Sequence, residues 1–253
     1  MGVGTAPYLT LGRGVRVLSQ QCVYPLEGCT VKKVVKRIRK WWRAWSQAKT
    51  VDRDGKRMVH GTAGQAAKAP KIMIIRHAEK PAGKVAGVDE MGASSGHHLS
   101  VRGWQRAGAL ACLFAPAQGP LQNALLATPA FIFASAAATD PEPGDTRSRR
   151  SEDTVAPLAH LIGVDINLNF SKGQETALAH AALGCNGPVL IAWRHEGIPL
   201  VANAILGMAA APQSWPKERF DVVFVFTLNP STGTYSFAQV AQRLLAGDPA
   251  EPI

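Results

Sequence analysis

One stretch sets the architecture of this chain: KIMIIRH, residues 71–77. It is a short, apolar, β-prone run that ends abruptly in Arg76-His77. A second apolar run, Pro188–Trp193, also ends in Arg-His, and a third, Phe131–Ser135, ends in a serine. In sheets of parallel strands, ligands bind outside the carboxyl ends of the strands. The three runs therefore predict buried strands that carry polar side chains to one edge of a sheet.

Helical patterns lie between these runs. Apolar residues recur with helical spacing after Leu99-Ser100, where Ser100 is a candidate N-cap, and a second helix is expected from about Arg149 to Ile162. Two more strands, 221–227 and 234–240, flank a turn sequence that indicates a hairpin. Strands that alternate with helices predict an α/β layer fold with a largely parallel sheet.

The positive charge is concentrated near the N-terminus. The chain has a net charge of +10, but residues 1–70 hold 14 lysines and arginines against three acids, whereas residues 71–253 hold 14 against 15. The basicity therefore belongs to an N-terminal extension and linker, residues 1–70, which we expect to be poorly ordered. The folded domain is predicted to span residues 71–253.

One segment of the extension, residues 31–45, has an amphipathic helical pattern. Its valines, isoleucine and tryptophans follow an i, i+3, i+4 spacing, and lysines and arginines fill the other face. This is the composition of an interfacial membrane helix or of an arm that binds anionic surfaces. The alternatives are a helix that packs on the body, a poorly ordered segment, or a natural start of the protein at Met58.

Several classes of protein are disfavoured by composition. No apolar run approaches the roughly 20 residues that span a bilayer, and the N-terminus lacks the pattern of a secretory signal. The four cysteines are scattered, and no His/Cys cluster has zinc spacing. We therefore expect a cytoplasmic protein without a metal site, and the oligomeric state stays open.

Arginines and histidines in these motifs suit a phosphate dianion. Arg76 adjoins His77, His195 ends another strand, and Arg150 falls in the first turn of a predicted helix, where backbone N–H groups attract anions. The fork of an arginine matches phosphate oxygens, and a neutral imidazole is a competent nucleophile toward phosphorus. A carboxylic acid is then needed to protonate the leaving oxygen.

Four motifs, in this order, resemble those of the histidine phosphatase superfamily. They are IRHAEKP (75–81), LSVRGWQRA (99–107), FAS (133–135) with RSEDT (150–154), and WRHEGIP (193–199). The resemblance covers roughly residues 71–245. It implies a phosphoglycerate mutase-like fold, which is a three-layer sandwich with a mostly parallel central sheet flanked by helices.

The resemblance also implies roles for individual residues. His77 would be the nucleophile that becomes phosphorylated. Arg76, Arg150 and His195 would bind the transferring phosphoryl group, and Ser135 matches the strand-end serine near the substrate. No metal or other cofactor is implied, because the cations of the protein would offset the phosphate charge.

The proton donor stays open. Glu196 directly follows His195 and resembles the His-Asp/Glu pair of one branch of the superfamily. Glu79, two residues after the nucleophile, is the rival and a further candidate for substrate binding. A third choice is an acid in another loop, such as Asp140.

Other arginines and histidines in these segments are weaker candidates for the phosphate site. Arg147 and Arg149 compete with Arg150, but the spacing to Thr154 favours Arg150. His97 and His98 lie in a loop, as substrate contacts or as part of an exposed turn. The arginines of the 99–107 motif, Arg102 and Arg106, are expected on the helix surface.

A phosphomonoesterase is the predicted activity. Only 44 residues lie between Arg150 and His195, too few for the long cap that shields the intermediate from water in sugar-phosphate mutases of the superfamily. Loops 81–98 and 136–147 are candidates for a partial lid. The substrate would be a small phosphorylated metabolite or a phosphoprotein. The alternatives are a phosphoglycerate-mutase-like phosphotransferase and a non-catalytic scaffold that binds phosphorylated ligands, with a basic arm for anionic surfaces.

Overall fold

The computed structural model describes residues 68–138 and 147–253. The amphipathic segment 31–45, Met58, most of the linker and Asp140 lie outside the described residues. Within the described ranges, every helix is too short or too polar to span a bilayer.

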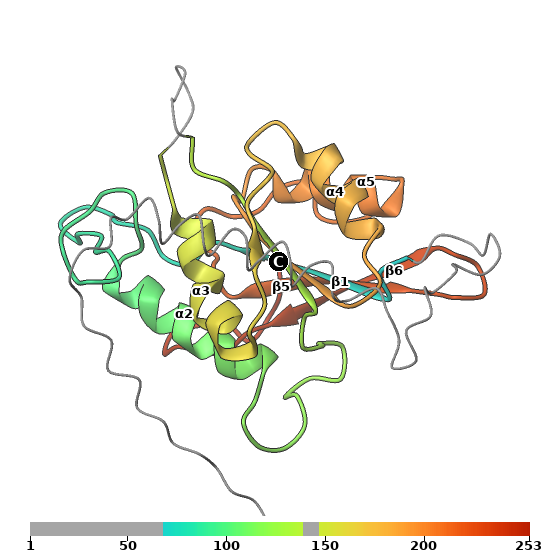
Figure 1. The fold of residues 1–253 in the computed structure, drawn as a ribbon, viewed down its shortest axis with the longest axis horizontal. Helices are drawn as coiled ribbons and strands as arrows, with labels where there is room; N and C mark the ends of the chain where they lie inside the picture. The colour runs from blue at the N-terminus through green and yellow to red at the C-terminus, as the bar shows by residue number, and fades with distance from the viewer. Residues whose placement is uncertain (1–67, 139–146) are drawn as a thin grey trace, which may run out of the picture. The chain divides into compact units, whose positions relative to one another are not determined.

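The core of the molecule is one six-stranded sheet with the order β3-β2-β4-β1-β5-β6 (Figure 1). The strands are β1 (Lys71–Arg76), β2 (Phe131–Ala134), β3 (Ile166–Asn167), β4 (Val189–Trp193), β5 (Val222–Leu228) and β6 (Tyr235–Ala241). The pairs β3–β2, β2–β4 and β4–β1 are parallel, whereas β1–β5 and β5–β6 are antiparallel. The predicted hairpin is the β5–β6 pair. The predicted α/β fold with a mostly parallel sheet is confirmed.

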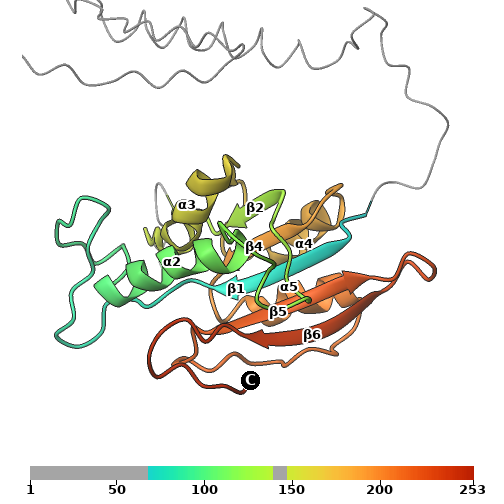
Figure 2. The same ribbon diagram turned by 90° about the horizontal axis from the view of Figure 1, so that it is seen from below.

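Two pairs of helices cover the two faces of this sheet, as Figures 1 and 2 show. The helices are α2 (Val101–Phe114), α3 (Arg150–Ile162), α4 (Glu175–Leu183) and α5 (Ile198–Leu206). Because side chains alternate along a strand, Met73 and Ile75 of β1 pack with α2 and α3, and Ile72 and Ile74 pack with α4 and α5. The predicted three layers are therefore present.

The N-terminus of α2 packs directly against the loop that follows β1. The hydroxyl of Ser100, the predicted N-cap, accepts a hydrogen bond from Gly103 N at 3.1 Å and donates to Glu79 O at 3.1 Å. A Cβ atom at Gly103 would lie 2.4 Å from Glu79 O, so only glycine permits this approach. Sequence motif LSVRG thus fixes the backbone just beyond His77.

Polar strand ends meet at one edge of the sheet. His77 N donates to Trp193 O at 2.9 Å, and Ser135 N donates to Ala192 O at 3.2 Å. The next residue, Ala78, donates its N–H to the hydroxyl of Thr154 on α3 at 2.8 Å. These bonds bring the ends of β1, β2 and β4 and the first turns of α3 to one place.

Arg106 is a correction to the sequence prediction. It was expected on the helix surface, but its side chain is 2% exposed and donates to Glu79 Oε1 and Asp248 Oδ1, both at 2.8 Å. Burial alone would lower the pKa of Arg106, but its hydrogen bonds to the two carboxylates hold it above its usual range. Position 106 lies one turn after Gly103, on the buried face of α2, where the two acids compensate its charge. Arg102 keeps the predicted exposure, at 48%.

Candidate active site

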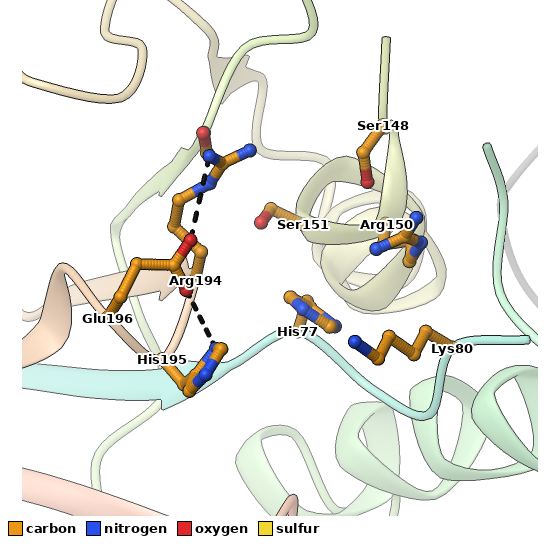
Figure 3. Close-up of a pocket in the computed structure, with 9 residues that line it drawn as sticks. His77, Lys80, Ser148, Arg150, Ser151, Arg194, His195 and Glu196 are labelled. Carbon is orange, nitrogen blue, oxygen red and sulfur yellow. Dashed lines mark ion pairs between the residues drawn. The ribbon is translucent and has the colours of Figure 1, made fainter. Parts of the chain in front are cut away.

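A pocket of about 120 Å³ opens at the shared edge of β1, β2 and β4 (Figure 3). Among the described residues, its walls are formed by His77, Lys80, Ser135, Ser148, Arg150, Ser151, Arg194, His195 and Glu196. Five predicted site residues, namely His77, Ser135, Arg150, His195 and Glu196, are therefore brought together. Neither Arg76 nor Glu79 is part of the wall.

His77 is a buried, neutral imidazole, 6% exposed. Its Nδ1 lies 2.7 Å from the carbonyl oxygen of Ala78. Because a carbonyl can only accept, Nδ1 must carry the proton, and Nε2 keeps its lone pair. Burial lowers the pKa of His77 to about 3, and the charges of Arg76 and Arg150 act in the same direction. The ring is therefore unprotonated at neutral pH, as a nucleophile must be.

Arg76 lies next to this wall without being part of it, and its guanidinium and the His77 ring both contact Phe220. Its Nη1 donates to the carbonyl oxygens of Pro216, Lys217 and Arg219 at 3.2, 2.5 and 2.9 Å. The guanidinium carbon lies 3.8 Å from the ring centroid of Phe220, within cation–π distance. Burial lowers the pKa of Arg76 to about 10, so the group stays charged at neutral pH.

Three buried donors around the site lack a partner. Arg76 Nε, Arg76 Nη2 and Arg150 Nε have no hydrogen-bond partner among the described residues. An unsatisfied buried donor costs about 1–3 kcal/mol, and more when it is charged. An anion that accepted these bonds would remove that cost, and arginine donors match phosphate oxygens. The three orphan donors thus indicate an anion site.

Arg150 is the arginine that reaches the pocket. It is the first residue of α3, its Nη2 donates to Gly96 O at 3.4 Å, and burial together with the charge of Arg194 lowers its pKa. The competitor Arg149 pairs instead with Glu152 at 2.8 Å, and Arg147 is exposed. The choice of Arg150 from its spacing to Thr154 agrees with these positions.

His195 and Glu196 form an ion pair on the more exposed side of the pocket. His195 Nδ1 lies 2.7 Å from Glu196 Oε2, and Arg194 Nη1 lies 3.7 Å from Glu196 Oε1. Figure 3 shows the Glu196 carboxylate between these two side chains. Burial and the charge of Arg76 lower the pKa of His195, and the Glu196 carboxylate opposes this shift. The side chains of His195 and Glu196 are 21% and 49% exposed.

The turn that carries this pair rests on a buried indole. Gly197 N donates to Arg194 O at 3.0 Å, which closes the turn before α5. A Cβ atom at Gly197 would lie 2.6 Å from Trp193 Nε1 and 2.7 Å from Glu175 Oε1. Trp193 Nε1 itself donates to Glu175 Oε1 at 3.2 Å. Glycine at 197 is therefore required for the turn to pack on Trp193 and hold His195 at the pocket.

Glu79, the rival acid, is engaged elsewhere. Its carboxylate accepts hydrogen bonds from Arg106 Nε at 3.1 Å and from Arg106 Nη2 at 2.8 Å, and Arg102 Nε lies 3.4 Å away. Of the two acids named beside the histidines, only Glu196 lines the pocket. Asp140 lies outside the described residues.

Four wall residues were not predicted: Lys80, Ser148, Ser151 and Arg194. In Figure 3 the Lys80 ammonium lies beside the His77 ring. The signal for Lys80 was its place in the loop after His77, and the signal for Ser151 was its place beside Arg150 in the first turn of α3. The side chain of Arg194 is 14% exposed.

Comparisons with known proteins find likeness in structure alone. No family model matches the sequence, and no curated protein matches it. Solved structures do resemble it. A mycobacterial glucosyl-3-phosphoglycerate phosphatase is similar at 13% identity and a TM-score of 0.40, over 70% of this chain and 100% of that chain.

Two further structures resemble the chain to the same degree. The protein histidine phosphatase SixA complexed with tungstate is 11% identical with a TM-score of 0.39, over 68% of this chain and 97% of that chain. The alpha-ribazole phosphatase from Shigella flexneri is 12% identical with a TM-score of 0.36, over 66% of this chain and 94% of that chain. These neighbours are members of the histidine phosphatase superfamily. At such low identity and TM-score they leave the activity of this chain to be inferred from its own site.

Proposed function

We propose that this chain is a phosphomonoesterase that works through a phosphohistidine at His77. The observation that carries the proposal is a buried, unprotonated His77 beside two arginines with unpartnered buried donors. A phosphoryl dianion supplies the acceptors that these donors lack. The imidazole Nε2, with its lone pair, is the atom that attacks phosphorus.

In the first step, His77 Nε2 forms a bond to phosphorus while the bond from phosphorus to the ester oxygen breaks. Phosphoryl transfer needs an in-line nucleophile and cations around the equatorial oxygens. Arg76 and Arg150 supply fixed charge, and Lys80, which lines the same pocket, adds to it. These groups offset the phosphate charge without a metal ion.

The leaving oxygen takes a proton from the His195–Glu196 pair. We assign the donor to Glu196, because it lines the pocket and is about half exposed, where a proton can be replaced from solvent. Its 2.7 Å contact with His195 Nδ1 lets the two residues hold the proton between them. Glu79 is held by Arg106 and is not assigned this role.

In the second step, water attacks the phosphohistidine. The phosphorus–nitrogen bond breaks, inorganic phosphate leaves, and the water proton passes to the Glu196 carboxylate, which restores the starting state. A pocket of about 120 Å³ has room for several water-sized groups. That volume suits a phosphoryl group and a water, with the rest of the substrate outside the pocket. The proposed substrate is a small phosphorylated metabolite or a phosphoprotein side chain.

The test is hydrolysis of an aryl phosphate, with a chelator present, by wild type, His77→Gln and the matched control His97→Gln. His97 is an exposed histidine outside the pocket wall. We expect His77→Gln to fall to background and His97→Gln to keep wild-type turnover. A rapid quench of the wild type in alkaline detergent should trap a phosphoprotein that is stable to base and labile to acid. Full activity of folded His77→Gln would refute the proposal.

The same assay separates hydrolysis from transfer. With an added alcohol as acceptor, we expect nearly all phosphoryl groups to appear as inorganic phosphate. A phosphotransferase would instead form the new phosphate ester as its main product.

A further inference from the structure

A short segment before α2 is tied to the first turn of α3, where Arg150 begins the helix. We call residues Gly96–His98 the brace. Arg149 N donates to His97 O at 3.0 Å, Arg150 Nη2 donates to Gly96 O at 3.4 Å, and His98 Nδ1 lies 3.0 Å from Asp153 Oδ2. The last contact is the only one of the three that joins two side chains.

The His98–Asp153 contact is shielded from solvent. The two side chains are 12% and 6% exposed, in contrast to the Arg149–Glu152 pair of the same turn, at 49% and 23%. Because a carboxylate accepts, the His98 Nδ1–H donates. A shielded contact with this geometry holds its elements together more strongly than an exposed ion pair does.

Arg150 depends on the brace for its direction. Its Nε is buried and unpartnered, and its Nη2 is held by the carbonyl of the brace residue Gly96. Thr154, at the other end of the turn, fixes the backbone by accepting from Ala78 N. The α3 backbone is thus anchored to the His77 loop, while the Arg150 guanidinium is oriented by the brace.

We propose that His98 and Asp153 are positioning residues that, through the brace, hold the Arg150 guanidinium ready for the phosphoryl group. This rests on the proposed function, because it assigns Arg150 to the anion. Neither residue lines the pocket, so both act through Arg150. Burial raises the pKa of the Asp153 carboxyl to about 6, and the contact with His98 opposes that rise.

The negative charge of Asp153 and its role in positioning Arg150 predict opposite effects of its removal on phosphate binding. The Asp153 carboxylate favours the charged form of Arg150, but its own negative charge repels a bound anion. If Asp153 acted only as a charge, its removal would tighten phosphate binding. If it acts through the brace, removal of its acceptor atoms must weaken binding, whereas an amide that still accepts must not.

The experiment measures the Kd of inorganic phosphate by calorimetry for the full chain. The variants are Asp153→Ala, Asp153→Asn and His98→Ala, with Glu152→Ala as the matched control on the same turn. We expect Asp153→Ala and His98→Ala to bind about tenfold more weakly, the low end of the effect seen when groups that orient a metal ligand are removed. Asp153→Asn and Glu152→Ala should stay within about twofold of wild type.

Kinetics and melting temperature complete the test. For the two alanine variants of the contact, KM for an aryl phosphate should rise by the same factor as the Kd, with a smaller change in kcat. A purely structural role would lower the melting temperature and leave the Kd of the folded protein unchanged. Equal effects of Asp153→Ala and Asp153→Asn, or tighter binding by either, would overturn the proposal. Wild type that binds no phosphate would refute the anion site itself.

Discussion

The pocket has two unlike halves. The inner half, His77 with Arg76, is 6% exposed or less, and main-chain carbonyls hold both side chains. The outer half, His195 with Glu196, is 21% and 49% exposed, and the Glu196 carboxylate contacts the side chains of His195 and Arg194. The inner half lies at the end of a central strand, and the outer half lies on the turn before α5.

This contrast matches two different demands of phosphoryl transfer. The nucleophile and the groups that bind equatorial oxygens must not reorganise, and a dry setting strengthens their charges. The proton donor must exchange protons with water in each cycle, and the leaving group must depart. The inner half of the pocket is thus rigid and buried, and the outer half is exposed to solvent.

We expect the largest effect on activity from removal of a cation that faces the inner half of the pocket. Arg150→Met should lower kcat/KM for an aryl phosphate by about 10²–10³-fold, the cost of losing one preorganised donor to a transition-state oxyanion. Arg149→Met, one residue earlier and paired with Glu152, is the control and should change kcat/KM little. Comparable losses of kcat/KM in both variants would mean that the total positive charge at the start of α3 binds the anion, and not the guanidinium of Arg150 in its specific position.

The outer half should show its role through the leaving group. Glu196→Gln cannot supply a proton, so we expect about 10²-fold slower turnover of an alkyl phosphate. For a nitrophenyl phosphate, whose leaving oxygen needs no proton, the burst of nitrophenol that reports the first step should slow severalfold at most. The ratio of the two rates is the measurement. Glu79→Gln is the comparison variant, and a leaving-group dependence there instead would move the acid to Glu79.

The smallest effect is the pH response of the inner half. The nucleophile must be unprotonated, and the pKa of His77 is lowered from 6.5 to about 3. Falling pH therefore protonates it only near pH 3. At saturating substrate, the contribution of His77 to kcat should change by less than about twofold between pH 6.5 and 4.5, where an ordinary imidazole would lose about fiftyfold. Circular dichroism confirms folding, and a steep loss of kcat centred near 6.5 in a folded enzyme would contradict a dry inner half.

Strands could be predicted because each is an apolar run with a sharp polar end. The helices that were missed carry weaker patterns. In α5, IPLVANAIL is apolar on nearly all sides, so it shows no stripe that separates helix from buried strand. Helix α4 has nine residues and β3 has two, which is too short for periodicity to register.

The sequence could predict pocket residues that lie directly at the end of a strand or the start of a helix. His77, Arg150 and His195 occupy such positions, and the order of strands and helices brings these positions to one edge of the sheet. The sequence could not predict that Glu79 binds a buried arginine. Arg106 is buried between Glu79 and Asp248, and Asp248 lies 142 residues after Arg106 in the chain. Nor could the sequence show that the Arg76 guanidinium is held by the carbonyl oxygens of Pro216, Lys217 and Arg219, since these lie 140 to 143 residues later in the chain.

The central place of β1 has a consequence for how the protein acquires its function. The strand that carries His77 is the first of the sheet in sequence, yet its hydrogen-bonding neighbours are β4 and β5, both more than a hundred residues later. Closing such long loops is entropically costly and slow. We therefore expect the surroundings of His77 to form at a late stage of folding. Recovery of the proposed hydrolysis after denaturation would then report on completion of the whole sheet, and a chain that stops before β4 would have Arg76-His77 without the pocket.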